Sequence, residues 1–193
     1  MYNLKNSCGA ILYTYNEFGE FGIILGLEGD HWLPFKGCSN FNETFEQAAI
    51  REIREETCNL VHIDNIKLDH IFMSKRKTYH IGLCYAPYDI IYKFDRVKKL
   101  YDDYSYKEKD KIKFFPFKNL LENRDIHVLT KLSIEFYWDK LYYMYNSSKK
   151  RTFYRKQTIS NNLARKYYEL LNIQNKVYNK YSYRSCYQRI IEV

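Results

Sequence analysis

The most constraining feature of the sequence is an amphipathic segment near its first quarter. From Thr44 onward, Phe45, Ala49 and Ile53 recur every four residues, which predicts a helix with one apolar face. Gln47 stands three residues after Thr44, the spacing of a capping box, so the helix should begin at that threonine. An amphipathic helix needs an apolar surface to pack on, and the rest of the chain must supply it.

Segments typical of β-strands lie on both sides of this helix. Residues 7–15 and 20–28 read as a hairpin around the turn-like NEFGE, and residues 29–37 read as a loop because of their Gly and Pro. Further strand candidates are residues 59–73, 78–88 and 110–117. This order predicts an α/β (α+β) fold in which a mixed β-sheet is sandwiched between helices.

The last third of the chain is helical by pattern and strongly basic. Residues 125–145 and 161–181 have helical character, and Ser160, Thr158 or Asn161 could cap the second helix. Residues 140–193 hold 12 Lys plus Arg against 2 Asp plus Glu, a balance of +10 in a chain of net charge +8, so residues 1–139 carry −2. We therefore expect a domain over residues 1–146 and a basic, Tyr-rich helical extension over 147–193, packed on or next to it.

Bulk composition fits one soluble domain of ordinary size. The 193 residues are 46% hydrophobic and 28% charged, with 7 Gly and 3 Pro, which is typical of a folded globular chain. No apolar run approaches the roughly 18 residues of a membrane span, and the N-terminus does not resemble a signal peptide. The 5 cysteines are scattered without a C-x-x-C pair, so reduced thiols and a cytoplasmic location are expected.

Three glutamates on the amphipathic segment suggest a cation site. Glu52, Glu55 and Glu56 stand at i, i+3 and i+4, so their carboxylates should project from one side of the helix, opposite the apolar face. Hard oxygen ligands suit Mg²⁺ or Mn²⁺, which keep several waters and bridge to substrate phosphates. The alternative is an ordinary solvated acidic face.

The residues around these glutamates favour the metal site. Gly37, Glu43, Arg51, Glu52, Ile53, Glu55 and Glu56 occupy, in order, the positions of G-x5-E-x7-R-E-U-x-E-E-x-G-U, where U is bulky and apolar. The chain in this respect resembles the Nudix hydrolase family. Two positions depart from the signature, with Cys58 in place of its last glycine and Asn59 in place of an apolar residue, which predicts an altered helix exit. In the preceding loop Pro34 stands one place earlier than in relatives.

The resemblance implies a role for each matching residue. Glu52, Glu55 and Glu56 would bind Mg²⁺ or Mn²⁺ with the backbone carbonyl of Gly37, and Arg51 would pair with Glu43 to brace the loop against the helix. The implied reaction is attack of water on a phosphoanhydride of a nucleoside diphosphate derivative. The general base would be Glu56 or Glu108, the latter because KEKDKIKFF resembles a late E-x-x-x-I-x-W/F-F segment of several Nudix enzymes.

Three functions remain open for such a chain. The SCGAILY segment, the lysine of FKG and the KIKFFPF segment resemble mRNA-decapping Nudix enzymes, including those of large DNA viruses. The first hypothesis is therefore hydrolysis of the mRNA 5′ cap to m7GDP and 5′-monophosphate RNA; the others are a house-cleaning hydrolase of dinucleoside polyphosphates or other nucleoside diphosphate derivatives, and a catalytically silent RNA-binding module. Basic and aromatic side chains suit RNA. Candidate substrate contacts are Trp32, Lys36, Tyr79 and His80, and candidate RNA contacts are Lys149, Lys150, Arg151, Arg155 and Lys156.

Overall fold

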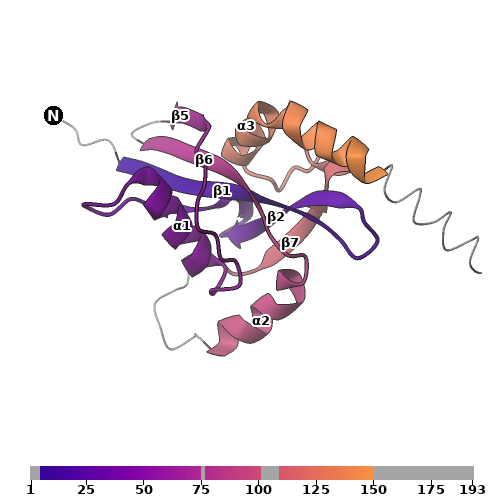
Figure 1. Ribbon diagram of the computed structural model, residues 1–193, viewed down its shortest axis with the longest axis horizontal. Coiled ribbons are helices and arrows are strands. Elements are labelled where there is room, and N and C mark those ends of the chain that lie inside the picture. The colour runs from indigo at the N-terminus through magenta and orange to yellow at the C-terminus, as the bar shows by residue number, and fades with distance from the viewer. Residues whose placement is uncertain (1–4, 75–76, 101–108, 150–193) are drawn as a thin grey trace, which may run out of the picture. The chain divides into compact units, whose positions relative to one another are not determined.

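The computed structural model describes residues 5–74, 77–100 and 109–149 (Figure 1). Residues 138–149 are also helical and follow α3. The elements are β1 (Lys5–Tyr15), β2 (Phe21–Glu28), β3 (His31–Leu33), β4 (Phe35–Cys38), α1 (Phe45–Glu56), β5 (His70–Ser74), β6 (Lys77–Tyr85), α2 (Ile90–Leu100), β7 (Ile112–Pro116), the 3-10 turn η1 (Phe117–Asn119) and α3 (Val128–Phe136).

The strands form one mixed sheet around β1. The main path of the sheet runs β3-β2-β1-β6-β5, and β4 and β7 branch from β1 and β2. β1 pairs in parallel with β6 along nearly its whole length, whereas its other partners β2 and β4 run antiparallel to it. The pairing of β4 sets Lys36 opposite Gly9 and Gly37 opposite Cys8, so the loop before α1 is fixed to the middle of the sheet.

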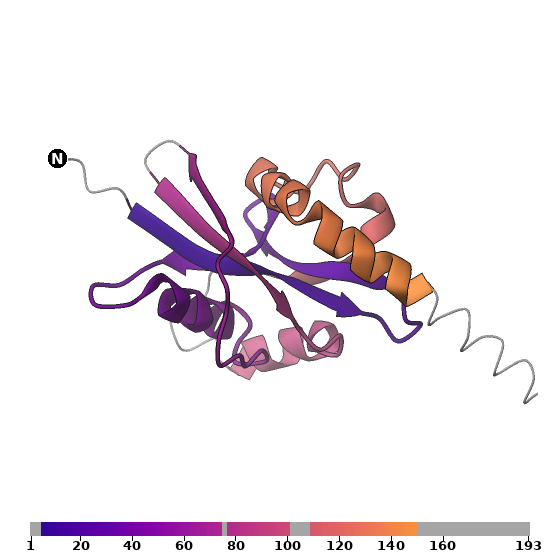
Figure 2. The same cartoon turned by 45° about the horizontal axis from the view of Figure 1, so that its top comes forward.

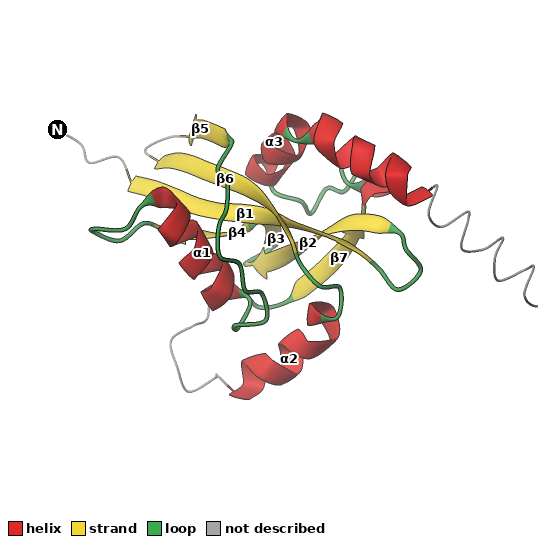
Figure 3. Cartoon of the chain, viewed as in Figure 1, coloured by secondary structure: helices red, strands yellow, loops and turns green. Residues whose placement is uncertain are grey.

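Helices cover both faces of the sheet, as predicted. α1 and α2 lie on one side, and α3 with the helix after it lies on the other, in both orientations shown (Figures 1 and 2). Successive side chains of β1 point to opposite faces of the sheet and so contribute to both cores. Ile11 packs with Ile134 of α3, whereas Leu12 packs with Ile53 of α1 and Phe94 of α2. The expected mixed sheet between helical layers is confirmed (Figure 3).

Two local expectations were wrong, and one helix was missed. Residues 29–37, expected as a loop, contain β3 and β4, because β2 and β1 offer them free edges to pair with. Residues 60–69, expected as strand, have no regular structure, and their apolar side chains instead pack directly on the α1–α2 side of the sheet. Helix α2 was not expected.

In the described part of the chain, no helix is both long and apolar enough to cross a membrane.

The docking of α2 should depend on one aromatic side chain. Phe94 is 1% exposed and packs in the core under the sheet, whereas Leu100 on the same helix is 77% exposed. We expect Phe94→Ala to lower the free energy of unfolding by about 3–5 kcal/mol, because it leaves a cavity in a closed core. Leu100→Ala should change it by less than about 0.5 kcal/mol. Urea denaturation of the two variants measures the difference, and equal losses would contradict the assignment of α2 to the core.

Candidate functional site

Helix α1 begins as its sequence predicts but packs through a different face. Thr44 caps it, and both halves of the capping box with Gln47 are present. The buried residues, however, include Glu52 and Glu56 together with Ala48, Ala49 and Ile53, while Phe45 is 38% exposed. The expectation that the glutamates lie opposite the apolar face was therefore wrong for these two.

Phe45 leaves the core because it has another partner. Its ring stacks on His80 of β6 with ring centroids 4.0 Å apart. Residues 45, 49, 52, 53 and 56 all fall on one side of a helix, so a face that begins at Phe45 also carries the two glutamates. Glu52 and Glu56 thus take positions that the helical period would normally give to apolar side chains.

The helix exit keeps its turn without a glycine. Cys58 and Asn59 have φ of 51° and 58°, and Asn59 N–H donates to Arg54 O, which closes the turn that commonly ends helices. Cys58, which stands where the signature has glycine, thus adopts the left-handed conformation that glycine usually supplies. Cys58 is buried among the apolar residues next to α1, and this packing offsets its conformational cost of about 1–2 kcal/mol.

Arg51 joins the loop before α1 to the acidic residues on the helix. Its Nε and Nη2 donate to the two carboxylate oxygens of Glu43, at 2.7 and 3.1 Å, as the brace between these residues requires. Its Nη1 donates to Glu52 and Glu55, and its Nη2 also reaches the carbonyl of Cys38. The hydrogen bonds to Glu43 are the largest cause that raises the pKa of Arg51, and the same pair lowers the pKa of Glu43.

Glu56 is buried between a backbone amide and a lysine. The N–H of Lys36 donates to its Oε2 at 2.7 Å, and the Nζ of Lys109 lies 3.2 Å from its Oε1. That Oε1 is buried and accepts no hydrogen bond of good geometry. Burial raises the pKa of Glu56, and the positive charges of Lys109 and Lys36 act in the opposite direction.

Glu28, at the end of β2, completes this cluster. The Nζ of Lys109 donates to Glu28 Oε2 at 2.6 Å, and the Nζ of Lys36 lies 3.7 Å from the same oxygen. Burial would raise the pKa of Glu28, but the hydrogen bond from Lys109 and the charges of Lys36, Lys109 and Lys77 lower it overall. The carboxylates of Glu28 and Glu56 therefore share one lysine.

Glu28 and Lys36 of this cluster also line a pocket of about 580 Å³. Glu52 lies in its wall against Gly37, so closely that a Cβ on residue 37 would stand 2.1 Å from the carboxylate. A side chain at residue 37 would therefore displace the carboxylate of Glu52. The residues that line the pocket are Ser7, Glu28, Lys36, Gly37, Cys38, Asn40, Arg51, Glu52 and Lys77.

The chemistry of this pocket fits a divalent cation. The carboxylates of Glu52 and Glu56 are hard oxygen donors, and Glu56 Oε1 is buried with Lys109 Nζ 3.2 Å away. Among the described residues, no three acidic, His or Cys side chains are gathered as a full ligand set. A bound Mg²⁺ or Mn²⁺ would therefore take further ligands from backbone, water or substrate, which is common for these ions. Glu55 points toward a second pocket on the outer side of α1.

The other predicted site residues are more scattered. Trp32 is partly buried on the α3 side of the sheet, Tyr79 stacks on Phe72, and His80 is buried beneath Phe45. The Nζ of Lys149 lies 4.3 Å from the ring centroid of Tyr145. Glu108 and the basic residues Lys150, Arg151, Arg155 and Lys156 lie outside the described residues, so their roles stay predictions.

Sequence reasoning missed Glu28, Lys77 and Lys109. Glu28 ends a strand and Lys109 stands in the Lys-rich run KEKDK, which has the pattern of an exposed turn. Their approach depends on pairing across 81 residues, in which Leu27 N–H donates to Lys111 O and Asp110 N–H donates to Leu27 O. Nothing local in the sequence signals it.

Comparisons with known proteins identify the fold. No protein-family model matches the chain, and neither does any curated protein. Among solved structures, a putative nudix hydrolase family member from Chromobacterium violaceum superposes with a TM-score of 0.50 at 19% identity, over 71% of this chain and 78% of that one. The protein therefore has the Nudix fold.

Two further solved structures are similar at lower scores. A C. elegans Ap4A hydrolase has a TM-score of 0.47 and 20% identity, over 69% of this chain and 96% of that one. A MutT/nudix family protein from Enterococcus faecalis has a TM-score of 0.43 and 19% identity. The match covers 58% of this chain and 43% of that protein's length.

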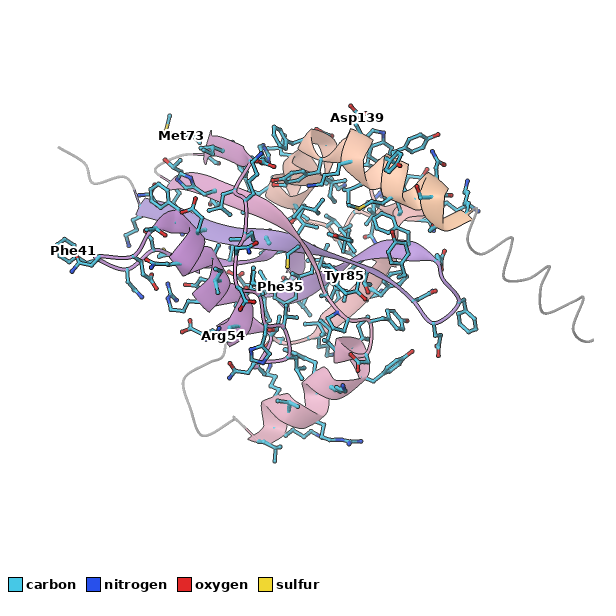
Figure 4. The ribbon with its side chains drawn as sticks, in the orientation of Figure 1. Phe35, Phe41, Arg54, Met73, Tyr85 and Asp139 are labelled. Atoms are coloured by element: carbon cyan, nitrogen blue, oxygen red, sulfur yellow. The ribbon has the colours of Figure 1, made fainter. Side chains whose placement is uncertain are left out.

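The hydrogen bonds of Arg51 should depend on the planar shape of its guanidinium group. Lysine keeps the charge but cannot hold Glu43, Glu52 and Glu55 at once, so we expect Arg51→Lys to lower the free energy of unfolding by about 1–3 kcal/mol. Arg54, exposed on the same helix (Figure 4), provides the matched control, and Arg54→Lys should stay within about 0.5 kcal/mol. Chemical denaturation measures both. If both variants have the same denaturation midpoint, the planar guanidinium of Arg51 contributes nothing to stability.

Proposed function

We propose that the protein is a metal-dependent Nudix pyrophosphohydrolase that cleaves the 5′ cap of mRNA, releasing m7GDP and 5′-monophosphate RNA. The observation that carries the hydrolytic part is the burial of Glu52 and Glu56 on the packing face of α1, with Glu52 against Gly37 in the wall of an open pocket. Stability alone favours apolar residues at such positions, because burying a charge is costly. Two carboxylates retained there support a binding role.

The residues of the pocket have complementary roles in such a reaction. Glu52 and Glu56 would hold Mg²⁺ or Mn²⁺ with the carbonyl of Gly37, and Arg51 keeps Glu52 in place. A divalent ion lowers the pKa of bound water and neutralises charge on pyrophosphate oxygens. Lys36 and Lys77 line the same pocket and would face the phosphates.

Water would attack one phosphorus, the P–O–P bond would break, and the proton would pass to a carboxylate. Glu56 is one candidate base, since burial raises its pKa. Glu108 is the other, one residue before Lys109.

The choice of capped RNA as substrate rests on the basic C-terminal region. Residues 140–193 combine a charge balance of +10 with 10 tyrosines, and RNA binding uses cations for phosphates and aromatic rings for bases. A hydrolase of small nucleotides has little need of such a region. Residues of the fold itself do not decide the substrate, because one fold serves many ligands.

The proposal is tested by comparing substrates with one enzyme. We expect the protein, with Mn²⁺ or Mg²⁺, to release labelled m7GDP from cap-labelled long RNA faster than it cleaves the free cap dinucleotide or diadenosine tetraphosphate. Glu56→Gln should lower turnover by about 100-fold or more, because it removes a buried metal carboxylate and candidate base. Thin-layer chromatography of the products gives the readout.

Glu46→Gln is the matched control, because Glu46 is exposed in the first turn of the same helix. It should retain normal turnover. If only the dinucleotides are cleaved, the substrate class is small nucleotides and not capped RNA. RNA binding without any turnover, and unaffected by Glu56→Gln, would instead identify a catalytically silent binding module.

RNA affinity should depend on salt through the basic region. Each phosphate contact to a single strand contributes about 0.7 to the slope of log K against log salt concentration. We therefore expect a shallower slope, by up to about 3, when four cations are replaced together by Gln. These are Lys150, Arg151, Arg155 and Lys156. Fluorescence anisotropy with labelled RNA at several salt concentrations measures the slope.

A control with the same change in net charge replaces four exposed lysines of the described domain. These are Lys67, Lys93, Lys99 and Lys118. The slope of this variant should stay close to that of the unaltered protein. Equal slopes in all three proteins would remove the electrostatic argument for RNA capture.

A further inference from the structure

The most unusual charged group in the described residues is the side chain of Lys109. It is fully buried, although lysine is almost never buried without a partner, and its Nζ touches two carboxylates. The contact to Glu28 is a hydrogen bond of 2.6 Å, and Glu56 Oε1 lies 3.2 Å away. Glu28 is half exposed at the pocket, whereas Glu56 is buried behind it.

The surrounding chain is built to hold this lysine. Its stem passes over Gly26, where a Cβ would stand 2.6 Å from Lys109 Cδ, so no larger residue fits at position 26. Lys98 of α2 donates to the carbonyls of Lys109 and Asp110, at 2.9 and 3.1 Å, and fixes the backbone that carries the side chain. β2 therefore contacts the stem of Lys109, and α2 holds the backbone of the segment that carries it.

The position of this ammonium matters for any cation at Glu56. Oε2 of Glu56 already accepts a hydrogen bond from the N–H of Lys36, so Oε1 is the less occupied of the two oxygens. Lys109 approaches that same oxygen. Two cations that share one buried carboxylate oxygen repel strongly, because screening is weak in the interior.

We propose, on the basis of the proposed metal-dependent function, that Lys109 is an internal counter-cation that competes with the divalent metal for Glu56, and that Glu28 receives its ammonium when metal binds. Without metal, Lys109 balances the buried charge of Glu56 and keeps the carboxylate oriented. When metal binds, the ammonium moves off Oε1 but keeps its shorter bond to Glu28. Lys109 and Glu28 thus set the metal affinity of the site, and they are positioning residues.

Direct binding of Mn²⁺, measured by electron paramagnetic resonance of the free ion, tests this without activity. Lys109→Met keeps an unbranched stem over Gly26 and removes the charge, so it should bind Mn²⁺ at least about 10-fold more tightly than the unaltered protein. Lys111→Met, two residues away and exposed, loses the same charge and should bind within about 2-fold. Equal or weaker binding by a folded Lys109→Met protein would overturn the proposal.

Glu28→Gln supplies an independent test, because Glu28 is partly exposed and its replacement should not disturb folding. The ammonium then has only Glu56 as a charged partner, so Mn²⁺ binding should weaken by about 5-fold or more. Asp30→Asn, an exposed neighbour, controls for simple loss of negative charge and should have a smaller effect. Glu28→Gln binding that equals or exceeds that of the unaltered protein would contradict the proposal even if Lys109→Met failed to fold.

Failure of the underlying function has a different signature. If Glu56→Gln binds Mn²⁺ as well as the unaltered protein does, Glu56 is not a metal ligand and the proposed active site is wrong. If Glu56→Gln loses Mn²⁺ while Lys109→Met and Glu28→Gln leave affinity unchanged, the metal site stands and only the role of Lys109 is rejected.

Discussion

Two carboxylates buried on the packing face of α1 are the constraint around which this domain is arranged. Glu52 and Glu56 are 6% and 4% exposed, and a charge removed from water must be paired. Arg51 meets Glu52 from the same helix. The amide of Lys36 in β4 and the ammonium of Lys109, in the segment before β7, meet Glu56. Segments distant in sequence are thus held at one place by the charges they neutralise.

Much of this arrangement follows from local sequence rules. The capping box at Thr44 and the β-rich runs at residues 7–15 and 20–28 predict elements that the structure contains. The same rules misjudged the sides of α1, because they count apolar residues as buried and acidic ones as exposed. Helix α2 had a detectable signal, since Ile90, Phe94 and Val97 follow a helical period and face the core. The burial of Lys109 had none, because it depends on long-range pairing.

In the proposed function, acidic groups would hold a metal and basic groups would face phosphates, and both kinds come from the same short segments. Lys36 has two roles: its backbone amide donates to Glu56, and its side chain lies near Glu28 and lines the pocket. Such a site suits a phosphoanhydride and leaves open what the phosphates are attached to. The partition of charge toward residues 140–193 is the feature of this chain that favours RNA as the remainder of the substrate.

In the proposed site, buried Glu52 and Glu56 bind a divalent metal together. Crystals grown with Mn²⁺, measured at a wavelength where manganese scatters anomalously, would locate the ion directly. We predict an anomalous peak in contact with both carboxylates, with Lys109 Nζ withdrawn toward Glu28. A structure with Mn²⁺ bound elsewhere, and with Lys109 still against Glu56, would contradict this account of the site.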